Sequence, residues 1–163
     1  MRETMRWIGI DPGSQAVGFA VIEEASRHYR LLRSEALYLP AKPLAERLPL
    51  IYTWLREQVQ GVIPAKGAAI EAPFVGRSVR SALTLGIVQG LIWGVLIEQG
   101  ISLITLSPAE IKRAITGRAH ASKEQVAATL RHHLTDEPKL PDSDHATDAI
   151  AIALAAAYHQ NSP

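Results

Sequence analysis

The 163-residue sequence contains no cysteine, which excludes disulfide bridges and thiolate metal sites. Any bound metal ion must therefore be held by oxygen or imidazole ligands. Long apolar runs are also missing, because the longest candidate, Ile87–Ile97, holds two glycines and is shorter than the roughly 20 residues of a membrane helix. Residues 1–6 lead directly into a short apolar strand and do not resemble a signal peptide. We therefore expect a soluble, cytoplasmic protein.

The composition is that of a globular protein, with 47% hydrophobic and 20% charged residues. The length suits a single domain over residues 1–163. The net charge is only +1, but the cations are concentrated between Phe74 and Lys123, where six Lys and Arg residues accompany two acidic ones. This basic middle between acidic flanks is compatible with a polyanion-binding face beside an acidic cluster, although on charge alone an ordinary solvated surface is the better explanation.

Apolar periodicity and turn signals predict an alternation of strands and helices without repeats or linkers. We expect strands at 6–11, 17–22, 29–38, 68–71 and 101–106, and helices at 43–59, 79–99, from Ser107, from Ser122 to about Leu134, and from Asp142 to about Tyr158. Three strands with short links favour an antiparallel meander, and the later strand–helix–strand units favour parallel pairs. The plan is α/β and resembles the RNase H-like fold, a mixed five-stranded sheet flanked by helices.

Two carboxylates end apolar strands. Asp11 precedes Pro12-Gly13 and is either a turn residue or a functional one. Glu71 follows Ala68–Ile70 and is either an exposed edge residue or a buried acid that requires a partner.

The last helix supplies further candidates. Asp148 lies one turn into it, and His145 lies three residues earlier on the same face. Asp142 and Asp144 are better explained as capping and first-turn anions. Together with the two strand-end acids, this set of hard ligands suits Mg²⁺ or Mn²⁺, and two such ions can activate water and stabilise the leaving oxygen in phosphodiester cleavage.

Three motifs resemble those of the RuvC resolvase family. The segments are Ile8–Ser14 followed by Val17–Ile22, Ala69–Phe74 followed by Ser81–Gly86, and Asp148–Ala153. They occur in the family's order over nearly the whole chain. The resemblance implies a homodimeric endonuclease that resolves Holliday junctions by two symmetric nicks, in DNA recombination and repair, together with the branch-migration proteins RuvA and RuvB.

The resemblance also assigns roles to individual residues. Asp11, Glu71 and Asp148 match acidic metal ligands, and His145 matches the fourth ligand position, with Asp144 as a fallback. We expect Asp11 to bridge two ions, with Glu71 on one side and His145 and Asp148 on the other. An imidazole in the set favours Mn²⁺ relative to Mg²⁺.

Five residues are candidates for DNA binding. Phe74 matches an aromatic side chain that stacks on an unpaired base, and the alternative is a loop phenylalanine in the core. Lys112 and Lys123 match basic residues near the scissile phosphate, although both also suit solvated helix positions. Arg77 and Arg80 are further candidates for phosphate contact.

One departure from the family concerns the long helix at 79–99. Its glycine-rich segment, Gly86–Gly90, lacks the arginine that related resolvases often have. The helix is apolar, so we expect it to cover the sheet, to form a dimer interface, or both.

Three alternative functions remain open. The first is an RNA-directed nuclease of the YqgF type. The second is an actin-like ATPase, which needs two such domains, and the third is a junction-binding module without catalysis.

Overall fold

The computed structural model describes residues 4–73 and 78–160. In this part of the chain, strands come first and helices dominate the second half, in the order β1 (Met5–Asp11), β2 (Ala16–Ala25), β3 (His28–Tyr38), α1 (Leu44–Gln60), β4 (Gly67–Glu71), α2 (Val79–Glu98), β5 (Leu103–Leu106), α3 (Pro108–Thr116), α4 (Lys123–Leu130) and α5 (Asp144–Gln160).

The strands form one mixed sheet in the order β3-β2-β1-β4-β5. β1, β2 and β3 form the predicted antiparallel meander. β4 pairs with β1 and with β5 in parallel, as the strand–helix–strand pattern requires. The predicted mixed five-stranded sheet is confirmed.

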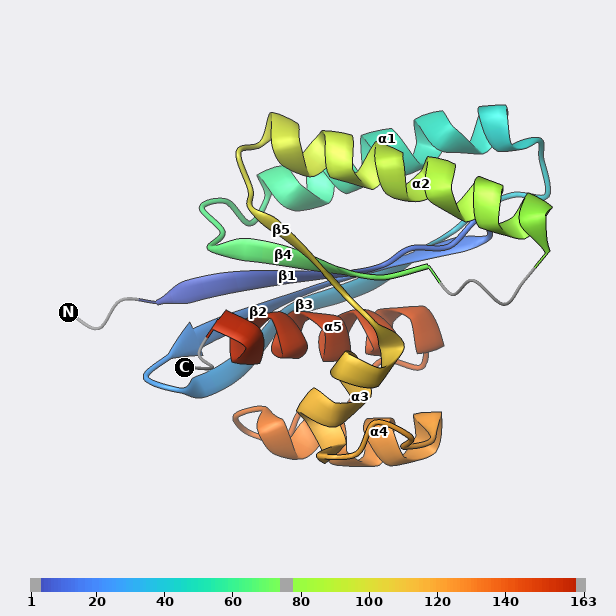
Figure 1. The fold of residues 1–163 in the computed structure, drawn as a ribbon. Coiled ribbons are helices and arrows are strands. Elements are labelled where there is room, and N and C mark those ends of the chain that lie inside the picture. The colour runs from blue at the N-terminus through green and yellow to red at the C-terminus, as the bar shows by residue number, and fades with distance from the viewer. Residues whose placement is uncertain (1–3, 74–77, 161–163) are drawn as a thin grey trace.

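Helices cover both faces of this sheet (Figure 1). α1 and α2 lie on one face, whereas α5, with α3 and α4 beyond it, lies on the other. Because side chains alternate along a strand, Ile8 and Ile10 of β1 join the apolar cluster under α1 and α2, while Trp7 joins the cluster around α5. The sheet therefore separates two cores.

Several element boundaries differ from the prediction, and β2, for example, continues to Ala25 rather than ending at Ile22. β5 begins at Leu103 rather than Ile101, because Gly100 adopts a left-handed φ of 68° and the Ile101 N–H donates to the Leu96 carbonyl to close α2. α4 ends at Leu130 rather than near Leu134, and a 3₁₀ turn at Arg131–His133 replaces its last turn.

α2 is the long apolar helix that the sequence predicts, and it ends at Glu98, one residue before the predicted end. An 18-residue window of it has a mean hydropathy of 1.6, which by length and composition alone would suffice to cross a membrane. Its buried side chains nevertheless join the core under α1, through Val88, Ile92, Val95 and Leu96. The opposite side of α2 is exposed and apolar.

Candidate active site

The two strand-end acids lie at the same edge of the sheet. β1 and β4 are adjacent and parallel, so their last residues, Asp11 and Glu71, end at the same side. Asp11 is 8% exposed, and Glu71 is half-buried. Gln89 of α2 is buried and donates to the Glu71 carbonyl at 2.9 Å, which fixes the end of β4. The strands therefore place two carboxylates beside each other.

α5 brings the other candidates to this edge because two glycines let it lie directly on the sheet. A Cβ at Gly9 would come within 2.1 Å of the Ala149 carbonyl oxygen, and a Cβ at Gly18 within 2.0 Å of the His145 carbonyl oxygen. Gly18 is also the β2 partner of Asp11. The sheet can thus seat the backbone of His145 next to Asp11 only because both positions lack side chains.

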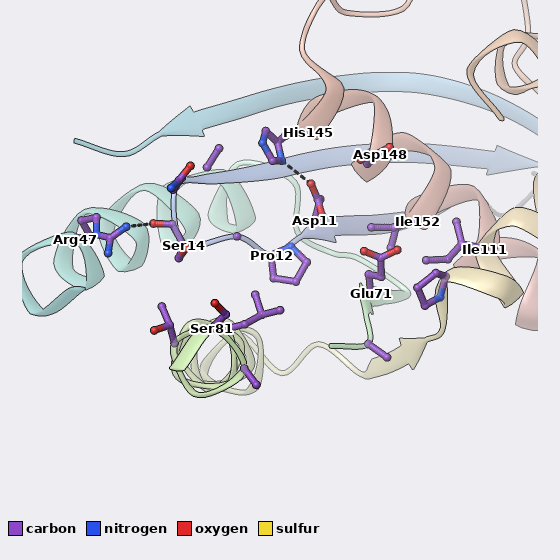
Figure 2. Close-up of a pocket in the computed structure, with 18 of the residues that line it drawn as sticks. Asp11, Pro12, Ser14, Arg47, Glu71, Ser81, Ile111, His145, Asp148 and Ile152 are labelled. Atoms are coloured by element: carbon purple, nitrogen blue, oxygen red, sulfur yellow. Dashed lines mark hydrogen bonds and ion pairs between the residues drawn. The ribbon is translucent and has the colours of Figure 1, made fainter. Parts of the chain in front are cut away.

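His145 and Asp11 are in direct contact, although they lie 134 positions apart in the sequence. His145 Nδ1 is 2.7 Å from Asp11 Oδ2 (Figure 2). When Asp11 is ionised and His145 is neutral, Nδ1 bears the proton and Nε2 keeps its lone pair, because an ionised carboxylate only accepts hydrogen bonds. Nε2 is the nitrogen that remains for a ligand, which is the usual arrangement of a metal-binding histidine with a carboxylate behind it.

In the absence of a cation, burial and neighbouring negative charge disfavour the ionised form of the carboxylates. Burial raises the pKa of Asp11, and the neighbouring Asp148 raises it further, against the lowering effect of its hydrogen bond to His145. Burial also raises the pKa of Glu71 to about 7, with contributions from Asp11 and Asp148. Two buried acids whose pKa values are raised by burial and by neighbouring carboxylates would be stabilised in their ionised form by a nearby positive charge.

Lysine provides part of that charge. Lys123, the first residue of α4, places its Nζ 3.2 Å from Asp148 Oδ2, and Asp148 raises the pKa of this lysine. The Lys123 side chain is 69% exposed, so its charge is also accessible from solvent.

These groups line one cleft of about 870 Å³. It brings together the four predicted metal ligands with three of the predicted DNA-binding residues, Arg80, Lys112 and Lys123. The fallback ligand Asp144 is exposed and does not line the cleft, so the geometry favours His145. Phe74 and Arg77 lie outside the described residues.

The cleft also contains residues that the sequence analysis did not single out. Arg47 of α1 lies at the opposite end of the cleft from Glu71 and donates to the Ser14 carbonyl in the loop after β1 (Figure 2). Its only sequence signal is a cation in an amphipathic helix, and that signal is common. Gln89 does not line the cleft but holds the end of β4, and it had a clearer signal because it is polar within an apolar helix.

The donor set fits a divalent cation in its chemistry. It offers hard carboxylate oxygens and one imidazole nitrogen, with a surplus of buried negative charge. Within residues 4–73 and 78–160, no three acidic or histidine side chains are already oriented around one point as metal ligands. Binding an ion at this cluster therefore requires rotation of side chains.

Comparison with known proteins identifies the family. The family model for crossover junction endodeoxyribonuclease RuvC matches residues 7–156. The RuvC protein of Roseiflexus sp. (strain RS-1) is 38% identical over 154 residues, which cover 94% of this chain and 90% of the relative. That of Dehalococcoides mccartyi is 35% identical over 157 residues, covering 96% and 94%.

Solved structures support the same family. Thermus thermophilus RuvC in complex with a Holliday junction substrate superposes with a TM-score of 0.87 at 30% identity, covering 96% of this chain and 94% of that one. The yeast mitochondrial resolvase Ydc2 shares the fold, with a TM-score of 0.66 at 11% identity. The predicted RNase H-like fold is confirmed, and the chain belongs to the RuvC family of crossover junction endodeoxyribonucleases.

Proposed function

We propose that this chain resolves four-way DNA junctions by paired symmetric nicks that depend on divalent cations. The observation that supports this most strongly is the convergence of Asp11, Glu71, His145 and Asp148 at one end of a cleft, in a chain that matches junction endonucleases over almost its whole length. The names of the relatives state the reaction, and the cleft supplies residues suited to it.

We propose Mg²⁺ or Mn²⁺ as the cofactor, with two ions per site held by Asp11, Glu71, Asp148 and His145 Nε2. When bound, such ions supply an activated water and stabilise the departing 3′-oxygen. The carboxylates hold their positions through the strand ends and α5. Lys112 and Lys123 neutralise the scissile phosphate from the α3–α4 wall of the cleft, and Arg80 contacts a phosphate further along.

We also propose that the chain acts as a homodimer through the exposed face of α2. Large apolar side chains follow each other along this face, with exposed fractions of 77% for Val79, 65% for Leu83, 50% for Ile87 and 71% for Ile97. They are spaced four, four and ten residues apart, which at 3.6 residues per turn keeps them within an arc of about 80° and so in one stripe. An apolar stripe of this length is unusual on a monomer's surface.

We propose a cytoplasmic location from the composition alone. We propose contact with RuvA and RuvB from family membership alone. Co-purification of the chain with RuvA and RuvB on junction DNA tests the second of these.

The experiment that tests the function is an end-labelled cleavage assay. It compares a mobile four-way DNA junction with a linear duplex and an RNA–DNA hybrid, each with Mg²⁺, Mn²⁺ or chelator. We expect symmetric nicks in the junction alone, with metal only. Cleavage of the hybrid would indicate an RNA-directed enzyme, and junction binding without cleavage under any metal would indicate a recognition module.

A further inference from the structure

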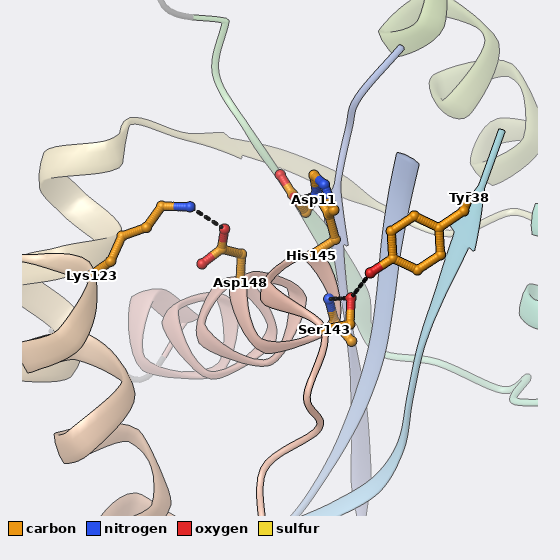
Figure 3. Close-up of polar contacts among 7 residues, drawn as sticks. Asp11, Tyr38, Lys123, Ser143, His145 and Asp148 are labelled. Carbon is orange, nitrogen blue, oxygen red and sulfur yellow. Dashed lines mark hydrogen bonds and ion pairs between the residues drawn. The ribbon is translucent and has the colours of Figure 1, made fainter. Parts of the chain in front are cut away.

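Tyr38 connects the edge of the sheet to the start of α5. It is the last residue of β3, paired with Ala16 of β2. Its hydroxyl donates to Ser143 Oγ at 2.8 Å (Figure 3). Its ring also meets the His145 imidazole edge-on, with centroids 6.2 Å apart and planes at 76°. One side chain thus touches both the turn before α5 and the candidate ligand on it.

Ser143 immediately precedes Asp144, the first residue of α5. Its Oγ accepts from the Ala146 N–H at 3.4 Å, and its carbonyl accepts from the Thr147 N–H at 3.0 Å. The Tyr38 hydroxyl therefore bonds to the capping group of the helix that contains His145 and Asp148. Movement of this turn would move both candidate ligands together.

His145 needs such support because its ring is exposed on one side. Its backbone lies against Gly18, but its side chain is 40% exposed, and within residues 4–73 and 78–160 its ring makes one hydrogen bond, to Asp11. A half-exposed ring can rotate about two torsions. Tyr38 occupies space beside the ring and limits that rotation.

We propose that Tyr38 is a positioning residue of the nuclease site. With Ser143, it holds the start of α5 against the edge strand. Through its ring, it keeps the imidazole turned so that Nδ1 donates to Asp11 and Nε2 is left for a ligand in the cleft. The consequence for cleavage rests on the proposed function, whereas the orientation of His145 does not.

Tyr38 is itself 64% exposed, so two consequences follow. Its replacement should leave the fold intact, because little apolar surface is lost from the core. Its exposure also offers a competing role, in which the ring stacks on DNA and contributes to binding instead of positioning.

The test uses Tyr38→Phe, which removes the hydroxyl, and Tyr38→Leu, which also removes the ring. Tyr52→Phe is the matched control, because Tyr52 of α1 donates an exposed hydrogen bond to Glu98 at 3.3 Å, away from the site. The first readout is the imidazole nitrogen and proton resonances of His145 in metal-free, ¹⁵N-histidine-labelled protein at fixed pH. The second is the junction dissociation constant and the cleavage rate at saturating protein.

For Tyr38→Leu, we expect the hydrogen-bonded Nδ1 proton resonance of His145 to shift or broaden, and the cleavage rate to fall about tenfold with unchanged junction affinity. For Tyr38→Phe, a fall of about threefold corresponds to one exposed hydrogen bond, and this effect should vanish in a Ser143→Ala background. Tyr52→Phe should change neither readout.

An unchanged His145 resonance in Tyr38→Leu would overturn the proposal. If affinity for the junction fell at the same time, Tyr38 would be a DNA contact. Should the wild-type chain not cut junctions at all, the proposed function fails, yet the resonance readout still decides whether Tyr38 orients His145.

Discussion

Helices α5 and α2 lie on opposite faces of the same sheet and are both apolar, yet they differ in how they are covered. α5 buries ten residues, most of them alanines, against the sheet and α3. α2 buries five and exposes a stripe of large apolar side chains. The apolar character of a helix therefore does not reveal whether its own chain covers it.

The glycines at the two helices show the same difference in how closely each helix is covered. Gly9 and Gly18 lie under α5, where a Cβ would overlap backbone atoms, whereas Gly86, Gly90 and Gly94 of α2 have nothing within 4 Å of a Cβ among the described residues. The close contact under α5 serves the site, because α5 supplies His145 and Asp148. The open face of α2 leaves room for a second copy.

The largest effect should come from Gly18→Ala. Its Cβ would displace the backbone of His145, so we expect a loss of about 1–3 kcal/mol in the free energy of unfolding. Cleavage should fall by about 100-fold because a candidate ligand is displaced. Denaturant unfolding and junction cleavage measure the two losses. A Gly18→Ala protein with wild-type cleavage would show that α5 need not lie so close.

The next largest effect should come from charges placed on the exposed apolar stripe of α2. Replacing both Leu83 and Ile87 by Lys places two charges on this face, and the free energy of dimer formation should weaken by about 2 kcal/mol or more. Sedimentation over a range of concentrations measures the change. Lysines at Arg56 and Glu57, on the exposed side of α1, serve as the control. A double variant that still dimerises like the wild type would place the interface elsewhere.

Glu71→Gln tests whether burial and neighbouring carboxylates raise the pKa of Glu71. The pKa of Glu71 is raised to about 7 from 4.5, so the folded, metal-free protein holds more protons than the unfolded chain between these values. Its stability should therefore fall as pH rises from about 5 to 8. Glu71→Gln should reduce this fall by about 1–2 kcal/mol, a figure discounted for partial exposure. Chemical denaturation with chelator at both pH values measures it, and an unchanged slope would contradict the raised pKa.

The smallest effect should come from Gly90→Ala, the counterpart of Gly18→Ala. Alanine favours a helix over glycine, and no neighbour obstructs its Cβ, so the monomer should gain about 0.5–1 kcal/mol. Denaturant unfolding at a concentration below the dimer dissociation constant checks the sign. Destabilisation there would mean that α2 is covered by its own chain.

Local signals in the sequence were sufficient for most of the fold. Ser107 and Ser122 both form capping boxes, with Glu110 and Gln125, and Pro108 opens α3 as predicted. Apolar periodicity identified each strand and helix to within about two residues, except at the ends of β2 and α4. These features depend on neighbours in the sequence, which is why they are predictable.

The details of the site depend on contacts between distant segments. Asp11 and Glu71 were candidates because each ends an apolar strand, but a turn residue and an edge residue explained them equally well until the resemblance to RuvC resolvases assigned them roles. The contact of His145 with Asp11, the seat of α5 on Gly18 and the link from Tyr38 to Ser143 all join positions far apart in the chain. Only the packing of α5 on the sheet reveals them.

The central claim, that the acidic cluster performs cleavage, is tested most directly by comparing Asp11→Asn with Glu57→Gln. Each variant removes one negative charge with little change in size, but Glu57 is exposed on α1 and does not line the cleft. Junction binding and junction cleavage are measured for both, with Mn²⁺ and with Mg²⁺. We predict that Asp11→Asn binds the junction as well as the wild type and produces no nicks, while Glu57→Gln cuts normally. Nicking by Asp11→Asn at the wild-type rate would contradict the account.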